Sequence, residues 1–294
     1  MLSLQKRRRD SLMVALDRKV RTGGRGTVDG RPVAAGEGWR VVDVVCTSGP
    51  ADRPFEERQA SASVSLVLSG TFVYRSDRGP SLMSPGALLL GNAGQTFECS
   101  HQHGEGDRCL SFHFAPELFE RLAHDAGAAR AEFDRDRLPP LRALAALTVR
   151  ARTAMEGRGS FEEIALELAG AAVKVAGRTR REVPAAATRD PTRVARVLHQ
   201  LESRVGEPHA LADLARAAGL SPYHFLRTFK RVTGITPHQW LLRARLRVAA
   251  QRLVATRDPV TEVALDVGFE DLSNFIRSFR AEFGMSPRRY RRSA

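Results

Sequence analysis

The chain has 294 residues, enough for about two domains, because a single core usually stops growing at roughly 100–200 residues. The net charge of +13 is uneven, since residues 189–294 hold 19 Lys and Arg against 10 Asp and Glu; this favours a polyanionic partner, although solvated arginines give the same count. Three cysteines and the absence of a long apolar run exclude a disulfide scaffold and a membrane span, and favour the cytoplasm.

The first segment, 1–38, is rich in Arg and Gly and has one short apolar run at 12–16, so it is predicted to be a basic arm or a single short helix. Between residues 39 and 114, short β-type runs alternate with turn residues. They predict strands at 39–46, 64–74, 87–90, 96–101 and 108–114. Short strands separated by Gly and Pro are typical of a small barrel or sandwich.

Residues 116–177 change to a helical pattern. Apolar side chains at helical spacing form one stripe, made of Phe161, Ile164, Ala165, Leu168, Ala172 and Val175. Such a stripe indicates core packing and equally fits a dimer seam. The next stretch, 178–189, is charged, contains Pro and Ala and has no periodicity, which predicts a linker.

Residues 190–294 are predicted to be all-helical from their capping signals. A capping residue precedes proline five times, at Asp190-Pro191, Ser221-Pro222, Thr236-Pro237, Asp258-Pro259 and Ser286-Pro287. The cap oxygen accepts from an unpaired backbone N–H, and proline at the first helical position needs no N–H partner. Thr236 with Gln239 also fits a capping box, which begins a helix predicted at 237–255.

A helix-turn-helix pattern begins near residue 211. Its turn is marked by Gly219, and its second helix carries Phe225 and Phe229 on one face. At about 100° per residue, the side chains opposite that face are Tyr223, Arg227 and Lys230. This outward surface is polar, basic and aromatic, which suits the major groove of DNA.

The same pattern recurs about fifty residues later, with Phe275 and Phe279 on the second helix and Ser273, Arg277 and Arg280 opposite them. Two copies in register are not an accident of packing. The helix between them would span roughly 28 Å, close to the roughly 34 Å between successive major grooves. Its arginines, at 243, 245, 247 and 252, are expected to contact phosphates or acidic partners, or to be solvated.

Residues 211–290 resemble the DNA-binding domain of the AraC/XylS family of transcription regulators. The resemblance covers about a third of the chain and rests on Leu214-Ala215, Gly219-Leu220-Ser221, Phe229-Lys230, Val267-Gly268-Phe269, Phe283-Gly284 and Ser286-Pro287. It implies that the outward residues of both second helices read bases, which adds Leu226, Leu272, Asn274 and Ile276. The apolar side chains among them would contact thymine methyl groups or pack at the domain edge. Arg227 and Arg277 are therefore the first candidates for contacts with bases.

The resemblance also implies the organisation of an α+β chain. Residues 39–177 would form a cupin-like β-barrel with a helical dimerisation region, which binds an effector, and residues 190–294 the domain with two helix-turn-helix units. The partners implied are double-stranded DNA, RNA polymerase, a small-molecule or metal effector and a second copy of the chain. Activation and repression both fit, and no catalysis is expected.

One cluster predicts metal chemistry. Cys99, His101 and His103 alternate along a predicted strand, and Cys109 follows a Gly-rich turn; thiol and imidazole suit a transition metal such as zinc or iron. A symmetric hairpin would put Cys109 on the face opposite His101, whereas a one-residue bulge would bring them together. The alternatives are a metal- or redox-responsive regulator, ordinary buried cysteines beside surface histidines, and, most remotely, a cupin enzyme.

Overall fold

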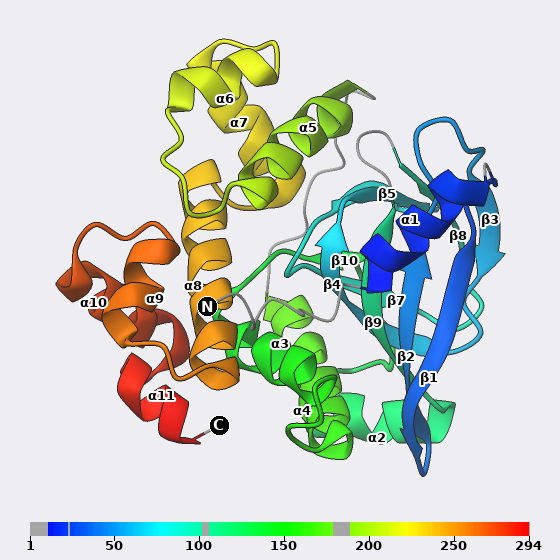
Figure 1. Ribbon diagram of the computed structural model, residues 1–294. Coiled ribbons are helices and arrows are strands. Elements are labelled where there is room, and N and C mark those ends of the chain that lie inside the picture. Colours follow the sequence, from blue (N-terminus) through cyan, green and yellow to red (C-terminus); the bar gives the residue numbers. More distant parts are fainter. Residues whose placement is uncertain (1–10, 23, 102–105, 179–188, 294) are drawn as a thin grey trace.

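The computed structural model describes residues 11–22, 24–101, 106–178 and 189–293. An N-terminal part of two β-sheets and supporting helices lies beside an all-helical C-terminal part (Figure 1). Within the described ranges, no helix is long and apolar enough to cross a membrane.

The larger sheet has six antiparallel strands in the order β1-β2-β9-β4-β7-β10. They are β1 Val28–Gly36, β2 Trp39–Cys46, β4 Ala62–Gly70, β7 Leu88–Gly91, β9 Asp107–Phe114 and β10 Arg137–Leu138. The strands expected at 39–46 and 108–114 are confirmed to within one residue. The single strand expected at 64–74 is wrong, because Gly70 adopts φ +78° and ends β4; a residue with a Cβ would be strained there.

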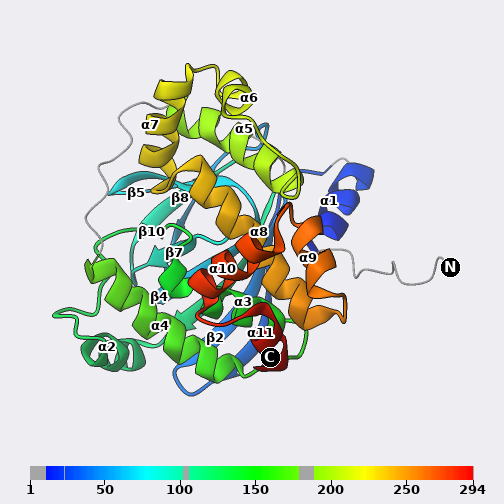
Figure 2. The same ribbon diagram turned by 90° about the vertical axis from the view of Figure 1, so that its left-hand side faces the viewer.

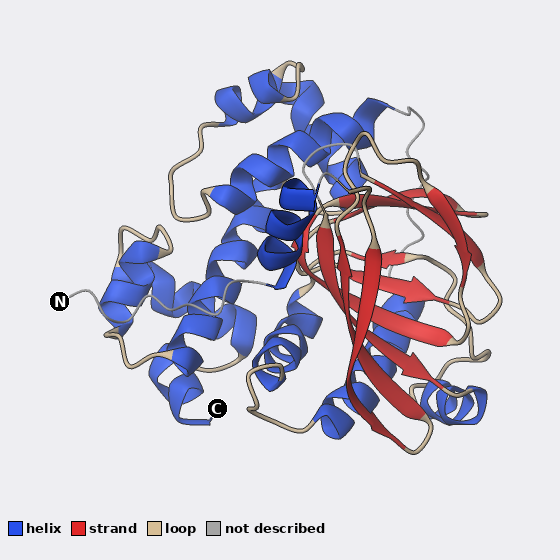
Figure 3. Ribbon diagram, turned by 45° about the vertical axis from the view of Figure 1, so that its right-hand side comes forward, coloured by secondary structure: helices blue, strands red, loops and turns tan. Residues whose placement is uncertain are grey.

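The smaller sheet has four antiparallel strands in the order β3-β8-β5-β6. They are β3 Phe55–Arg58, β5 Phe72–Ser76, β6 Gly79–Met83 and β8 Thr96–Ser100. Its inner side chains pack against one face of the larger sheet, with Phe72, Tyr74 and Met83 meeting Val67 and Leu89. Among the described residues no strand pairing joins the two sheets, so the expected closed barrel is not found and the strands form two layers (Figure 3).

Three helices, α2 Pro116–Asp125, α3 Arg142–Ala154 and α4 Phe161–Arg178, cover the other face of the larger sheet. The strand residues Leu110 and Phe112 share a buried cluster with Leu144 and Leu168 of these helices. In the predicted α4 stripe, Ile164, Ala165, Leu168 and Ala172 are all buried in this cluster. The stripe is therefore core packing, and these four side chains are not a dimer seam.

Within the segment 1–38, residues 11–22 form α1 Ser11–Thr22, which agrees with the predicted alternative of a single short helix. The expected arm does not extend to residue 38, because β1 pairs along its length with β2 at the edge of the larger sheet. Lys19 attaches α1 to the loop between β2 and β3 by donating from Nζ to Asp52 Oδ2 at 2.9 Å. Residues 1–10 lie outside the described residues. So do residues 179–188 of the predicted linker, which fall between α4 and the first C-terminal helix.

The C-terminal part consists of α5 Arg189–Ser203, α6 Leu211–Ala217, α7 Pro222–Thr233, α8 Pro237–Ala255, α9 Val260–Asp266, α10 Leu272–Phe283 and α11 Pro287–Ser293. Figure 2 shows α8 running between one group of helices, α5 to α7, and another, α9 to α11. The predicted α8 is confirmed, including the capping box of Thr236 and Gln239. Two of the expected starts differ: Asp190-Pro191 lies inside α5, and α9 begins at Val260, after Pro259.

The two parts share buried contacts. Val73 of β5 and Leu82 of β6 belong to the same cluster as Phe225 and Phe229 of α7. On the other side of α8, Val149 of α3 packs into the cluster formed by α8, α9 and α10. The C-terminal helices therefore rest on both the smaller sheet and the helical layer.

Candidate functional site

The first helix-turn-helix unit comprises α6 and α7. Gly219 in the turn has φ +63°, which a residue with a Cβ rarely adopts. Ser221 then caps α7, accepting from the backbone N–H of His224 at 3.4 Å. Phe225 and Phe229 are fully buried, with ring centroids 5.6 Å apart, and fix which side of α7 faces inward.

The outward side of α7 holds the four side chains that the sequence selected, Tyr223, Leu226, Arg227 and Lys230, and all four are exposed. Arg227 donates from Nη1 to Tyr223 Oη at 3.4 Å, and its Cζ lies 5.7 Å from the centre of the tyrosine ring. A guanidinium above an aromatic face is attracted by the ring's negative potential. The pair therefore presents a cationic hydrogen-bond donor, packed on an aromatic ring, to the outside.

The second unit comprises α9 and α10. Here the cap is Asp271, whose two carboxylate oxygens accept from the backbone N–H of Ser273 at 3.1 Å and of Asn274 at 2.8 Å. Phe275 and Phe279 are fully buried, as their counterparts are in α7. The turn from Gly268 to this cap is one residue longer than the turn from Gly219 to Ser221.

The outward side of α10 holds the other six predicted side chains, all exposed: Leu272, Ser273, Asn274, Ile276, Arg277 and Arg280. Arg277 donates from Nη2 to Asn274 Oδ1 at 3.1 Å. Sequence reasoning missed one cation beside this surface. Arg142, at the start of α3, lines a shallow surface hollow together with Ile276 and Arg280. No local signal marks Arg142, because only the packing of α3 against α10 brings it there.

The two outward surfaces repeat each other at a fixed offset. Residues 225, 227, 229 and 234 correspond to 275, 277, 279 and 284, and both helices end at a glycine, Gly234 with φ 79° and Gly284 with φ 77°. The 19 residues of α8 extend roughly 28 Å between the two units.

The arginines of α8 make contacts within the chain. Arg245 donates to the backbone oxygens of Val205, Glu207 and Gly268 at 2.7–2.9 Å. Arg252 donates from Nε to Asp258 Oδ2 at 2.8 Å, so the acidic partner expected for it belongs to its own domain.

Two further α8 arginines face the N-terminal part. Arg243 donates to the backbone oxygen of Pro140, and Arg247 lies against Gly86 and Pro140. Burial lowers the pKa of Arg247 to about 10. The basic charge of α8 therefore supports the fold of this region.

The predicted cysteine–histidine cluster is rearranged. His103 lies outside the described residues, and β8 and β9 belong to different sheets, so the expected hairpin is wrong. His101 Nε2 lies 2.7 Å from Asp107 Oδ1, and Cys109 Sγ donates to Asp107 Oδ2 at 3.4 Å. Cys99 lies on β8; burial, and then the nearby Asp107 carboxylate, hold its thiol pKa well above the usual value.

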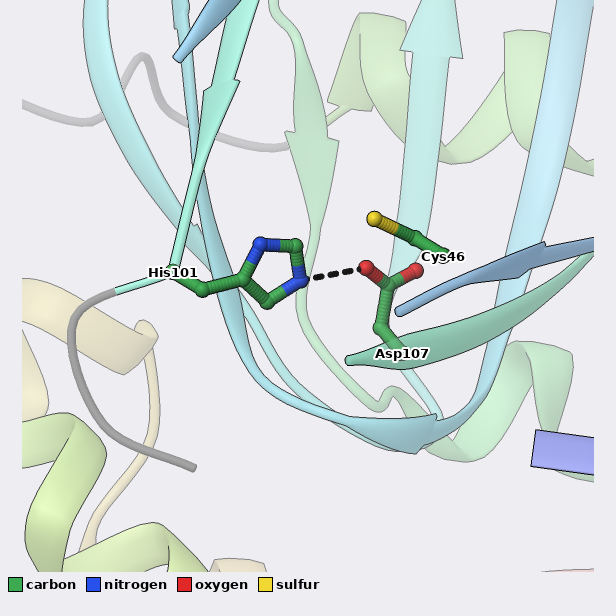
Figure 4. A group of neighbouring side chains, drawn as sticks. All are labelled: Cys46, His101 and Asp107. Atoms are coloured by element: carbon green, nitrogen blue, oxygen red, sulfur yellow. Dashed lines mark hydrogen bonds and ion pairs between the residues drawn. The ribbon is translucent and has the colours of Figure 1, made fainter. Parts of the chain in front are cut away.

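The structure instead brings in Cys46, which sequence reasoning did not select. One donor atom each from Cys46, His101 and Asp107 lie within 4.8 Å of one another, and all three residues are buried (Figure 4). Burial raises the pKa of the Cys46 thiol, and the neighbouring Asp107 carboxylate raises it further. None of the three cysteines forms a disulfide.

Comparisons with known proteins concern the C-terminal part. Residues 214–293 match the model of a family described as a helix-turn-helix domain. The probable transcriptional regulator LumQ of Photobacterium leiognathi is 39% identical over 31% of this chain and 36% of its own length. The transposon Tn10 TetD protein of Escherichia coli is 35% identical over 33% of this chain and 70% of its own length.

Among solved structures, an AraC-type transcriptional regulator from Chromobacterium violaceum is 28% identical, covers 34% of this chain and 90% of its own, and has a TM-score of 0.33. The chain spans about a third of the length of several curated relatives that it matches, at 36%, 30% and 32%.

Proposed function

This chain belongs to the AraC family, and we propose that it is a sequence-specific transcription regulator that reads double-stranded DNA with α7 and α10. The observation that carries the proposal is the repeated exposed surface of these two helices. The first, α7, leads into the start of α8, and the second, α10, follows α9 after the end of α8 (Figure 2). The roughly 28 Å length of α8 is close to the roughly 34 Å between successive major grooves, which suits one basic helix in each groove.

Arg227 and Arg277 are the base-reading residues of the proposal. A guanidinium can donate two parallel hydrogen bonds to O6 and N7 of guanine, the commonest specific contact in the major groove. Each of these arginines is held at its outer end by a neighbour, Tyr223 or Asn274, which reduces the entropy lost on binding. Lys230 and Arg280, one turn further along each helix, would approach the phosphates.

The N-terminal part would then be a cupin-like effector domain. Buried polar side chains between the two sheets, among them Ser63, Ser65 and Ser111, support an effector site there. The family resemblance further supports a homodimer and contact with RNA polymerase. It also supports a location in the cytoplasm, where bacterial DNA lies. No enzymatic activity is part of the proposal.

The test is selection of bound duplexes from a random DNA pool by the full chain. The double variant Arg227→Ala/Arg277→Ala is compared with Arg216→Ala, which removes an exposed arginine of α6 that is paired with Asp213. We expect an enriched motif with two base clusters about one helical turn apart, lost in the double variant and kept in the control. Binding without enrichment, equal in all three proteins, would overturn the proposal.

A further inference from the structure

We infer that Cys46, His101 and Asp107 form a binding site for one Zn²⁺ ion at one end of the sandwich. The site comes from both sheets. Cys46 is the last residue of β2 and Asp107 the first of β9, and the two are direct cross-strand partners. His101 follows β8 of the smaller sheet. The exposed fractions are 5% for Cys46 and 6% each for His101 and Asp107.

The donor atoms converge on one point. In Figure 4 the imidazole ring of His101 points at the carboxylate of Asp107, and the sulfur of Cys46 lies beside that carboxylate. On a tetrahedral zinc ion with ordinary bond lengths, such donors lie about 3.4–3.6 Å apart. The three donors lie within 4.8 Å of one another, so side-chain shifts of about 1 Å accommodate the ion.

The donor types favour zinc among the common divalent ions. Thiolate and imidazole are poor ligands for Mg²⁺ and Ca²⁺, which prefer oxygen, whereas zinc accepts sulfur, nitrogen and carboxylate oxygen together. Three protein ligands leave the fourth position for a water or an incoming ligand. Cys109 supports the arrangement from outside by donating to the second oxygen of Asp107, which orients the carboxylate.

The balance of charge gives an independent reason to expect a cation at this site. Asp107 is a buried carboxylate whose ion pair, in the part of the chain that the structure describes, is with His101. The neighbouring Arg108 is turned to the other face of the sheet, where it pairs with Asp43 at 2.8 Å. A thiolate, a carboxylate and a neutral imidazole around Zn²⁺ carry no net charge, which removes the cost of burying the carboxylate without a full counter-charge.

Close backbone packing makes the site stiff. A Cβ on Gly106 would lie 2.4 Å from the backbone oxygen of Cys46 and 2.8 Å from Leu12 Cδ1. Leu12 belongs to α1 and is 5% exposed, so α1 covers this end of the sheets. A ligand set held by packed backbone loses little entropy when the ion binds.

The site also has a short route to α7. Ser100, beside His101, pairs with Val73, and Val73 pairs with Leu82 on the next strand. Val73 and Leu82 both pack in the cluster that contains Phe225 of the first helix-turn-helix unit. Two strand pairings therefore connect the zinc site to the C-terminal part, and any displacement of Ser100 on binding zinc would be passed along them. This regulatory role rests on the proposed function, whereas the site itself does not.

The test uses the full chain, reduced and stripped of metal, titrated with Co²⁺ as a spectroscopic substitute for Zn²⁺. Cys46→Ser and His101→Gln remove proposed ligands, and Cys99→Ser makes the same thiol change at a neighbouring cysteine. We expect one Co²⁺ per chain, with a thiolate-to-cobalt charge-transfer band that Zn²⁺ abolishes by displacement. Both ligand variants should lose at least about tenfold in affinity, and Cys99→Ser should keep the band. Thermal unfolding verifies that each variant is folded.

Two outcomes overturn the site: no charge-transfer band in folded wild-type protein, or a band that survives Cys46→Ser and disappears in Cys99→Ser. The regulatory role is measured as the Kd for the selected duplex with and without Zn²⁺. A several-fold change in wild type that is absent from Cys46→Ser supports it, and an unchanged Kd with zinc bound overturns it. Failure to select any duplex counts against the proposed function and leaves the Co²⁺ result as it stands.

Discussion

Arg137 of β10 donates from Nη1 to the backbone oxygen of Thr233, the last residue of α7, at 2.8 Å. The final carbonyl groups of a helix have no partner within it, and the helix dipole favours a cation there. Arg137 is 5% exposed, so this charge is committed to the contact. The N-terminal part thus contacts the end of α7, the second helix of the first helix-turn-helix unit, directly.

Replacing this arginine should weaken the fold. We expect Arg137→Met to lower the free energy of unfolding by about 2–3 kcal/mol, because a buried carbonyl loses a charged donor. Urea unfolding measures the loss. The control is Arg130→Met, at an exposed position, which should change stability by less than about 0.5 kcal/mol. Equal losses in the two variants would show that the contact contributes nothing.

A second variant tests the packing between α8 and the sheets. Gly86 has φ +86°, and a Cβ there would lie 2.3 Å from Nη1 of Arg247. Gly127 has nearly the same φ, +83°, with nothing within 4 Å, so it isolates the backbone strain. We expect Gly127→Ala to cost about 1–2 kcal/mol. Gly86→Ala should cost a further 1–3 kcal/mol or so, because Arg247 must move. If both variants had similar midpoints of unfolding in urea, the packing between Arg247 of α8 and Gly86 would not be tight.

Single arginine variants should distinguish the contribution of α7 to DNA binding from that of α10. We expect Arg227→Ala and Arg277→Ala each to weaken binding to the selected duplex by about 1–3 kcal/mol, roughly 5- to 150-fold. Each should relax the base preference in one cluster only. Competition with duplexes mutated in either cluster measures this. A uniform loss across all sequences would instead assign that arginine to the phosphate backbone.

Acid should destabilise the protein through His113. Burial, and secondarily the charge of its strand partner Arg40, lower the pKa of His113 to about 4. The unfolded chain binds a proton below about pH 6.5, whereas the folded chain resists it until about pH 4. The contribution of His113 to the free energy of unfolding is therefore fully present above pH 6.5 and is lost as the pH falls towards 4. The total loss is at most about 3 kcal/mol.

The measurement is urea unfolding of wild type, His113→Gln and His124→Gln at pH 7.5 and 4.5. Only His113→Gln should have a smaller loss at low pH, because the side chain of His124 is 89% exposed. The same loss in all three proteins would assign the effect to other groups.

The C-terminal helices could be predicted because their signals are local. Thr236 and Gln239 lie three residues apart and define the start of α8 without any tertiary information. The errors occur where another contact competes. Asp258 precedes a proline, but its carboxylate accepts from Arg252, and α9 begins two residues later. The cap of α10, Asp271, has no proline after it, and the cap–proline rule missed it.

The sheets were harder to predict because their pairing is decided by distant residues. β1 contains glycine, proline and alanine and has almost no strand signal of its own; its pairing with β2 makes it a strand. The cluster of Cys46, His101 and Asp107 is likewise decided by distant residues. Cys46 and Asp107 are separated by about sixty residues, and only the register of β2 with β9 places them opposite each other. The alternation of Cys and His along one predicted strand could identify His101, but it could not identify Cys46 and Asp107, which lie on other strands.

The linking helix α8 has one proline, at its first position, and no glycine, so its backbone offers no point of flexure. A helix turns by about 100° per residue, so the length of α8 sets both the separation and the relative rotation of the two helix-turn-helix units that it connects. Half a turn of DNA added between the two base clusters would move one of them to the far side of the duplex. Because the length of α8 is fixed, one chain cannot adjust to a different spacing of the two base clusters. Binding to such a duplex would require deformation of the DNA or a second chain.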